Sequence, residues 1–235
     1  MSTGETILYA LLGGLLPTLL WLWFWLREDC LHPEPRRLIV LTFLAGMFVV
    51  LLVLPLERFA AGFLGGSVLL IAWAAIEELM KFGAAYLMAL RRRAVDEPID
   101  AVLYMITAAL GFAALENALF LLGPLSTEHF LVTLMTGNLR FLGATLLHTL
   151  ASATIGLSLA LPFYRNPRLR RWTLLAGIIL AVFLHALFNF LILERGGSQV
   201  LVVFAGVWMG IVTLLLLVEK VKRVRRPQFV YLRKK

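Results

Sequence analysis

Three ionisable side chains, Glu77, Glu78 and Lys81, lie within one and a half helical turns of an otherwise apolar stretch. A charge at bilayer depth costs about 2.5–3.5 kcal/mol on insertion scales, so such residues commonly mark a functional site. Later apolar stretches carry further polar side chains, namely Glu116, Asn117, His148, His185 and Asn189. Carboxylates can take a proton from water, imidazoles can orient that water or protonate a leaving amine, and a His–Asn pair can stabilise an oxyanion. These residue types indicate hydrolytic chemistry.

The stretches that hold these residues are long enough to cross a membrane. Of the 235 residues, 61% are hydrophobic and 15% are charged. A transmembrane helix needs about 20 apolar residues. Seven stretches fit that length approximately: 6–26, 38–55, 67–90, 100–122, 140–163, 172–193 and 199–218. We therefore predict an all-α fold, a single polytopic membrane bundle over residues 1–235 that ends in a basic tail, 219–235.

Basic residues alternate between the two ends of these stretches. Eighteen of the 22 lie in the tail and in the connections 27–37, 91–99 and 164–171, whereas the alternate connections hold three. By the positive-inside rule, the N-terminus is outside and the C-terminus is cytoplasmic. We expect the tail to rest on the anionic headgroups of membrane lipids and not to bind nucleic acid.

The polar residues of different stretches should meet at one depth. With a rise of about 1.5 Å per residue, Glu77, Glu116, His148 and His185 lie about 9–15 Å below the outer face. His185 and Asn189 are four residues apart and therefore share a helix face. Such polar stripes point at neighbouring helices or at a water-filled cavity.

Ion pairs that only hold helices in register offer a structural explanation. This explanation suits Lys81, which lies three residues from Glu78. It does not balance the charge, because the three glutamates of the group exceed its one lysine by two negative charges if both histidines are neutral. A protonated carboxylate, a protonated histidine or a bound cation relieves such an excess. Each of these outcomes is also a way of building a catalytic site.

Known catalytic motifs narrow the chemistry. Ser152 lies one turn from His148, but the chain has no G-x-S-x-G elbow and no H-E-x-x-H zinc motif. The one cysteine, Cys30, has no partner for a disulfide. The segment Pro124–Asn138 is too short to span, so we expect an interfacial or re-entrant segment on the outer face that could act as a lid.

In this order, the motifs resemble those of the PrsW-type intramembrane proteases, within the wider superfamily of the CAAX prenyl proteases. The resemblance covers roughly half the chain. It rests on E-E-x-x-K from Glu77 to Lys81, G-F-x-x-x-E-N from Gly111 to Asn117, Arg140 with His148, and H-x-x-x-N from His185 to Asn189.

The resemblance implies a membrane-embedded endopeptidase in which Glu77 is the base and His185 and Asn189 form the oxyanion hole. The full catalytic set that we expect is Glu77, Glu78, Glu116, His148, His185 and Asn189. Glu116 stands where the superfamily has a water-orienting histidine, so either His148 takes that role or a divalent metal such as zinc is bound. The metal ligands would then be Glu77, Glu116, His148 and His185. No pair has a familiar zinc spacing, and we favour the metal-free glutamic mechanism.

The family is known for the first cut in membrane-anchored anti-sigma factors. The resemblance therefore implies a single-pass membrane protein as substrate, such as an anti-sigma factor, which is cut near the outer face of a bacterial inner membrane. Two alternatives stay open on the sequence: a proton- or ion-coupled transporter, and a membrane scaffold without activity. A transporter would be favoured by Gly or Pro breaks in paired spans, and no such symmetric pair occurs.

Overall fold

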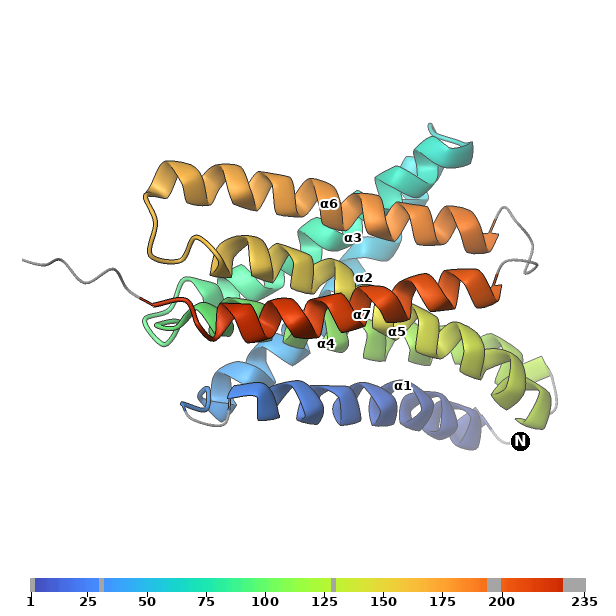
Figure 1. The fold of residues 1–235 in the computed structure, drawn as a ribbon. Helices are drawn as coiled ribbons and strands as arrows, with labels where there is room; N and C mark the ends of the chain where they lie inside the picture. Colours follow the sequence, from blue (N-terminus) through green and yellow to red (C-terminus); the bar gives the residue numbers. More distant parts are fainter. Residues whose placement is uncertain (1–2, 30–31, 128–129, 194–199, 226–235) are drawn as a thin grey trace, which may run out of the picture.

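The computed structural model describes residues 3–29, 32–127, 130–193 and 200–225, which fold into a bundle of helices (Figure 1). No strand occurs among these residues. A 3₁₀ turn, Arg27–Asp29, follows the first helix, and a π turn, Tyr86–Leu90, extends the third. The seven α-helices are α1 (Thr3–Leu26), α2 (Arg36–Ala61), α3 (Gly66–Ala85), α4 (Pro98–Thr127), α5 (Phe130–Ala160), α6 (Pro167–Leu193) and α7 (Val200–Val221).

Each of the seven apolar stretches corresponds to one helix, which confirms the polytopic helical bundle. Six helices are long and apolar enough to cross a membrane. The exception is α3, which carries Glu77, Glu78 and Lys81. With its π turn, α3 covers residues 66–90, about 37 Å, which still exceeds the ~30 Å hydrocarbon core. The charges therefore set α3 apart by composition and not by length.

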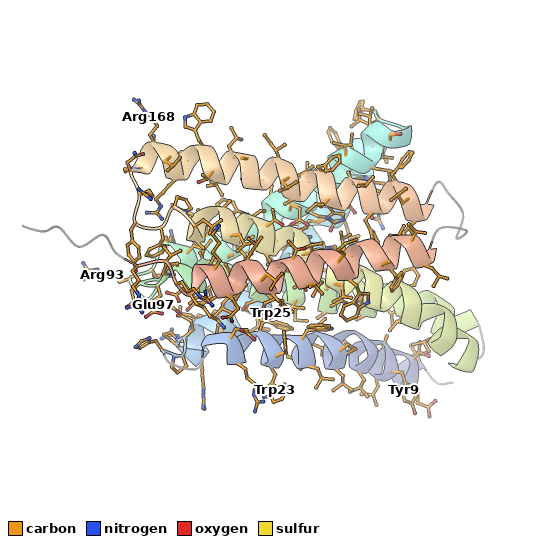
Figure 2. All side chains as sticks on the ribbon, viewed as in Figure 1. Tyr9, Trp23, Trp25, Arg93, Glu97 and Arg168 are labelled. Carbon is orange, nitrogen blue, oxygen red and sulfur yellow. The ribbon has the colours of Figure 1, made fainter. Side chains whose placement is uncertain are left out.

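The connections rich in basic residues lie at one end of the bundle. Figure 2 shows Arg93, between α3 and α4, and Arg168, at the start of α6, at the end opposite to Tyr9 of α1. This arrangement agrees with the alternation of basic residues along the chain. The orientation with an external N-terminus stays a prediction from that alternation.

Helix α4 forms the core of the bundle. Its residues from 99 to 114 are buried, and it packs against α1, α2 and α5. Glycines allow α2 to approach it closely, because a Cβ on Gly46 would lie 2.1 Å from the carbonyl oxygen of Ala108 and one on Gly111 would lie 2.0 Å from that of Phe43. Small residues at such crossings let membrane helices pack backbone to backbone.

Contrary to the expectation from the sequence, the segment Pro124–Asn138 does not form a separate interfacial element in its described part but belongs to the ends of two long helices. Helix α4 continues to Thr127 and α5 begins at Phe130, so the described part of the segment is helical. The run Phe130–Met135 contains no helix breaker and continues directly into the fifth span. The resulting helix has 31 residues, about 46 Å. A lid would depend on residues 128–129 and on side chains that, like Cys30, lie outside the described part.

Candidate catalytic cavity

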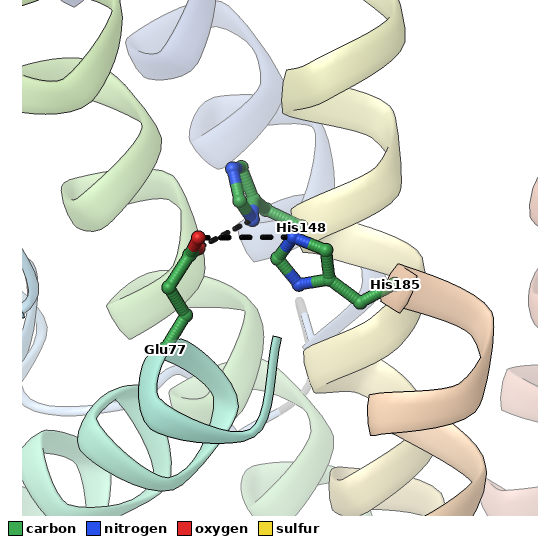
Figure 3. A group of neighbouring side chains, drawn as sticks. All are labelled: Glu77, His148 and His185. Carbon is green, nitrogen blue, oxygen red and sulfur yellow. Dashed lines mark ion pairs between the residues drawn. The ribbon is translucent and has the colours of Figure 1, made fainter. Parts of the chain in front are cut away.

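Four helices bring the expected polar residues to one place. Side chains of α3, α5 and α6 meet in Figure 3, where Glu77 faces both His148 and His185. Most of these side chains are buried; Glu116 and Asn189 are partly exposed, and 37% of the Glu116 side chain is accessible. The set comprises Glu77, Glu78 and Lys81 of α3, Glu116 of α4, His148 and Ser152 of α5, and His185 and Asn189 of α6.

Glu78 is saturated with partners inside the bundle. Lys81 Nζ donates to its Oε1 at 2.6 Å, and Ser152 Oγ donates to its Oε2 at 2.9 Å. Nδ1 of His185 lies 2.8 Å from Oε1 of the same carboxylate. Glu78 and Lys81 are fully buried. Three donors thus surround one carboxylate, and Glu78 ties α3 to α5 and α6.

Glu77 has longer contacts and faces open space. Its Oε2 lies 3.5 Å from Lys81 Nζ and 3.8 Å from His148 Nδ1, and its Oε1 lies 3.8 Å from His185 Nε2. Charge-assisted hydrogen bonds of this type are usually about 2.7–2.9 Å long. The two neighbouring glutamates therefore differ: Glu78 is held by its partners, and Glu77 is available to a ligand.

The hydrogen-bond partners assign the proton on each imidazole ring. Glu78 is an acceptor for His185 Nδ1, so a neutral His185 carries its proton on Nδ1 and presents the lone pair of Nε2 towards Glu77. His148 Nδ1 lies 2.9 Å from Lys81 Nζ, and its Nε2 lies 2.8 Å from Glu116 Oε2. A neutral His148 therefore accepts from Lys81 and donates to Glu116.

Phe112 closes the buried side of this cluster. Its ring centroid lies 4.5 Å from Lys81 Nζ and 5.3 Å from the ring centroid of His148, which meets it edge to face. A cation over an aromatic face is stabilised by the ring quadrupole. Phe112, one turn before Glu116, thus packs against both Lys81 and His148 on the buried side of the cluster.

A cavity of about 230 Å³ opens on the other side of Glu77. It is bordered by side chains of α2, α3, α4, α5 and α6, including three carboxylates and no lysine or arginine among the described residues. The lining residues that can do chemistry are Glu57, Glu77, Glu116, His148, His185 and Asn189. The other lining residues are apolar or aromatic, so the polar side chains gather on one part of an otherwise apolar wall.

Asn117 does not belong to the cavity. Its Nδ2 donates to Thr145 Oγ1 at 3.1 Å, which links α4 to α5. Asn189 does border the cavity, and the described residues provide no hydrogen bond to its side-chain amide. The motif partner of His148, Arg140, is a residue of α5 whose side chain lies outside the described part.

Glu57 is a cavity residue that the sequence analysis missed. The second apolar stretch ends at residue 55 by hydropathy, so Glu57 and Arg58 read as a polar connection. The helix continues to Ala61 and carries Glu57 to the cavity. An ionisable residue within two positions of a membrane span was the signal that could have found it.

Three side chains could together hold a metal ion. Glu77, His148 and His185 each offer one ligand atom, and these atoms lie within 4.8 Å of one another. Glu116 is not in this group, because its carboxylate faces the other nitrogen of His148. Both imidazoles thus contact a carboxylate through one nitrogen, the usual outer-shell partner of a ligating histidine. The donor set therefore fits a divalent metal such as zinc.

Comparisons with known proteins agree with this geometry. The family model described as "PrsW family intramembrane metalloprotease" matches residues 34–217. The Protease PrsW of Geobacillus kaustophilus (strain HTA426) is 27% identical over 224 residues, which cover 93% of this chain and 94% of that protein. The Protease PrsW of Bacillus subtilis (strain 168) is 25% identical over 186 residues, which cover 77% and 81%.

A third relative extends the similarity to another organism. The Protease PrsW of Clostridioides difficile (strain 630) is 25% identical over 179 residues, which cover 72% of this chain and 74% of that protein. No solved structure matches the chain. All of the cavity residues lie within the segment that the family model matches.

Proposed function

Because the chain belongs to the PrsW family of intramembrane proteases, we propose that it cuts a single-pass membrane protein and activates the attacking water with Glu77. Membership in a protease family favours an enzyme over the transporter and over the inactive scaffold. One observation supports Glu77, and not Glu78, as the base. Lys81 is paired with Glu78 at 2.6 Å, which leaves Glu77 at the edge of the cavity with a 3.5 Å contact to the same lysine.

In the proposed reaction, the Glu77 carboxylate takes a proton from water while the water oxygen attacks the carbonyl carbon of the scissile peptide. The C–N bond then breaks, and Glu77 returns the proton to the leaving amine. General acid–base catalysis by one carboxyl group in this way typically contributes about 10²–10⁴-fold in rate. His185 Nε2 lies 3.8 Å from Glu77. Its lone pair can accept a hydrogen bond from the second O–H of the water, which orients that water.

The developing oxyanion needs a hydrogen-bond donor at the cavity wall. Asn189 offers its amide N–H groups, which have no partner among the described residues. His185 can add a second donor only as an imidazolium, because its neutral form presents a lone pair at Nε2. We therefore assign the main oxyanion contact to Asn189 and the orientation of the water to His185.

His148 and Glu116 form a supporting pair. The imidazole lies between Lys81 and Glu116, with contacts of 2.9 Å and 2.8 Å, and its side chain is almost fully buried. Such a ring is held in one orientation. Because both of its nitrogens are engaged, we infer that His148 holds Lys81 and Glu116 in place and shapes the cavity, and that His185 orients the water.

A second candidate mechanism uses a divalent metal, which the description of the family as metalloproteases favours. Glu77, His148 and His185 would hold the ion, with Glu78 and Glu116 as outer-shell partners. A bound metal would supply Lewis-acid activation of water. Lys81 weighs against this arrangement, because its ammonium group already contacts both Glu77 and His148.

The position of the cut follows from the depth of the cavity. We propose that the scissile bond lies at the outer end of the substrate's transmembrane span, since the apolar stretches of the sequence predict a depth of about 9–15 Å below the outer face for Glu77, Glu116, His148 and His185. A peptide bond within an intact helix is shielded by its own hydrogen bonds. Mapping the new termini of a cleaved substrate tests this, and a cut on the cytoplasmic side would contradict it.

The test of the function is a comparison of membrane proteomes. Cells that express the wild-type chain or Glu77→Gln should differ in one or a few single-pass proteins, which are shortened only with the wild type. Equal insertion of the two variants, measured by their abundance in the membrane fraction, is the control. Identical proteomes in spite of equal insertion would contradict the proposal.

A further inference from the structure

Glu57 is the ionisable residue of the cavity to which the reaction above gives no task. It lies in α2 after the apolar run Val53–Leu56. A carboxylate within a membrane span is costly unless it faces a cavity or a partner. Glu57 meets that condition, because it lines the 230 Å³ cavity together with Glu77 and Glu116.

Trp73 fixes the position of Glu57. Its indole Nε1 donates to the backbone carbonyl oxygen of Glu57 at 3.1 Å. Trp73 lies on α3 one turn before Glu77, so the two side chains share a helix face, and Trp73 lines the same cavity. The hydrogen bond therefore sets the register between α2 and α3 at the level of the proposed base.

Glu77 lacks a close partner on its buried side. Lys81 and both imidazoles lie 3.5–3.8 Å from its carboxylate oxygens, beyond the usual length of a charge-assisted hydrogen bond. On the cavity side, Glu57 lines the same cavity as Glu77, and its backbone is anchored by Trp73 from the helix face that carries Glu77. Glu57 is thus placed to decide how the carboxyl group of Glu77 points into the cavity.

We propose that Glu57 is a positioning residue, whose protonated carboxyl group donates a hydrogen bond to the Glu77 carboxylate and holds it in the orientation that receives a proton from water. Trp73 supports it by fixing the backbone of α2. The inference rests on the proposed role of Glu77 as base. It adds α2 to the four helices that carry the family motifs, and it gives a role to a carboxylate near the end of a mainly apolar helix.

The test measures kcat and KM separately for variants at this position. The probe is a quenched fluorescent peptide with one transmembrane span and its outer flank, taken from a protein that is cut in wild-type but not in Glu77→Gln membranes. Glu57→Ala should lower kcat by about 10–100-fold, because a small misplacement of a catalytic group can cost about 10²-fold, with little change in KM. Glu57→Gln keeps a hydrogen-bonding group of the same shape and should restore most of kcat.

Arg58→Gln is the matched control, because Arg58 is the adjacent, exposed residue of α2 and does not line the cavity. It should leave both constants unchanged. Wild-type kcat in Glu57→Ala would overturn the inference, and so would a rise in KM alone, which would indicate a substrate contact. A loss in Glu57→Gln as large as that in Glu57→Ala would overturn it as well.

Trp73→Phe keeps the test decisive if Glu57→Ala fails to insert. It removes the indole donor, retains an aromatic ring and should lower kcat by less than Glu57→Ala does. Wild-type kcat in Trp73→Phe, or a large loss of kcat in Glu57→Gln, would then overturn the inference. Cleavage by the wild type and none by Glu77→Gln supports the proposed function whatever the outcome at Glu57, so the two proposals fail separately.

Discussion

Acidic side chains gather at both ends of helix α4, and the two groups have different partners. At its start, Asp100 accepts the backbone N–H groups of Asp96 and Glu97 at 2.9 Å and 2.8 Å. Nearby, the Tyr104 hydroxyl donates to Glu34 at 2.5 Å. Towards its other end, Glu116 contacts an imidazole nitrogen and borders a cavity.

The difference separates a structural cluster from a chemical one. Two backbone N–H groups donate to Oδ2 of Asp100 at the start of the helix and stabilise its first turn. In the cavity, carboxylates meet imidazoles, which can exchange protons, and Glu77 keeps room for a ligand. Cavity volume alone would not identify the site, because a hollow of about 620 Å³ beside Glu34 is larger than the proposed catalytic cavity of about 230 Å³. The partners of each carboxylate, and not the space, identify the site.

Substitutions in the two clusters should differ most in their effect on the cleavage activity. Glu77→Gln removes the proton acceptor with little change of shape and should lower cleavage by about 10²–10⁴-fold. Asp100→Asn, the matched change at the other cluster, should leave cleavage close to that of the wild type. Both are measured as turnover of the same peptide by purified protein in proteoliposomes. Equal losses in the two variants would break the distinction.

The buried lysine of the cavity cluster should contribute more to stability than a lysine at the surface. Lys81→Met leaves the buried carboxylate of Glu78 without its cation and should lower the free energy of unfolding by about 3–5 kcal/mol. Lys222, which contacts Glu28 and Glu219 at the surface, is the control, and Lys222→Met should cost less than about 1 kcal/mol. Denaturant titration in detergent micelles measures both. A stable Lys81→Met variant would show that the buried lysine is not structural.

A substitution at the start of α4 should cause a smaller loss of stability. Asp100→Ala deprives two backbone N–H groups of their acceptor, and loss of such a cap typically costs about 0.5–2 kcal/mol. Cleavage at a temperature well below unfolding should be retained. The check is a thermal melt together with the turnover assay. Loss of activity in a folded Asp100→Ala protein would give this end of α4 a catalytic role that we do not assign to it.

The smallest effect should be that of chelation. If Glu77 acts as a base without a metal, a membrane-permeant chelator should leave cleavage by purified protein unchanged, because Lys81 already supplies positive charge beside Glu77 and His148. Metal content measured by mass spectrometry accompanies the assay. Activity that is lost to the chelator and restored by Zn²⁺ would replace the glutamic mechanism with the metal one.

Much of this molecule is determined by the local sequence. Hydropathy alone located the seven helices, because the cost of exposing polar groups to lipid acts on each stretch separately. The charged group on α3 stood out for the same reason. The helical spacing of Glu77, Lys81, His185 and Asn189 placed them on inward faces, and the structure brings them together.

The roles of individual carboxylates were decided only by the tertiary structure. Glu77 and Glu78 are adjacent and identical in type, yet Glu78 meets three donors from three helices and Glu77 borders the cavity. Asn117 turned to Thr145, and Glu57 entered the cavity from a helix outside the motifs. Contacts of this kind join residues up to 107 positions apart. Hydropathy and helical period describe one helix at a time, whereas a carboxylate's chemistry depends on the charges and donors that other helices place around it.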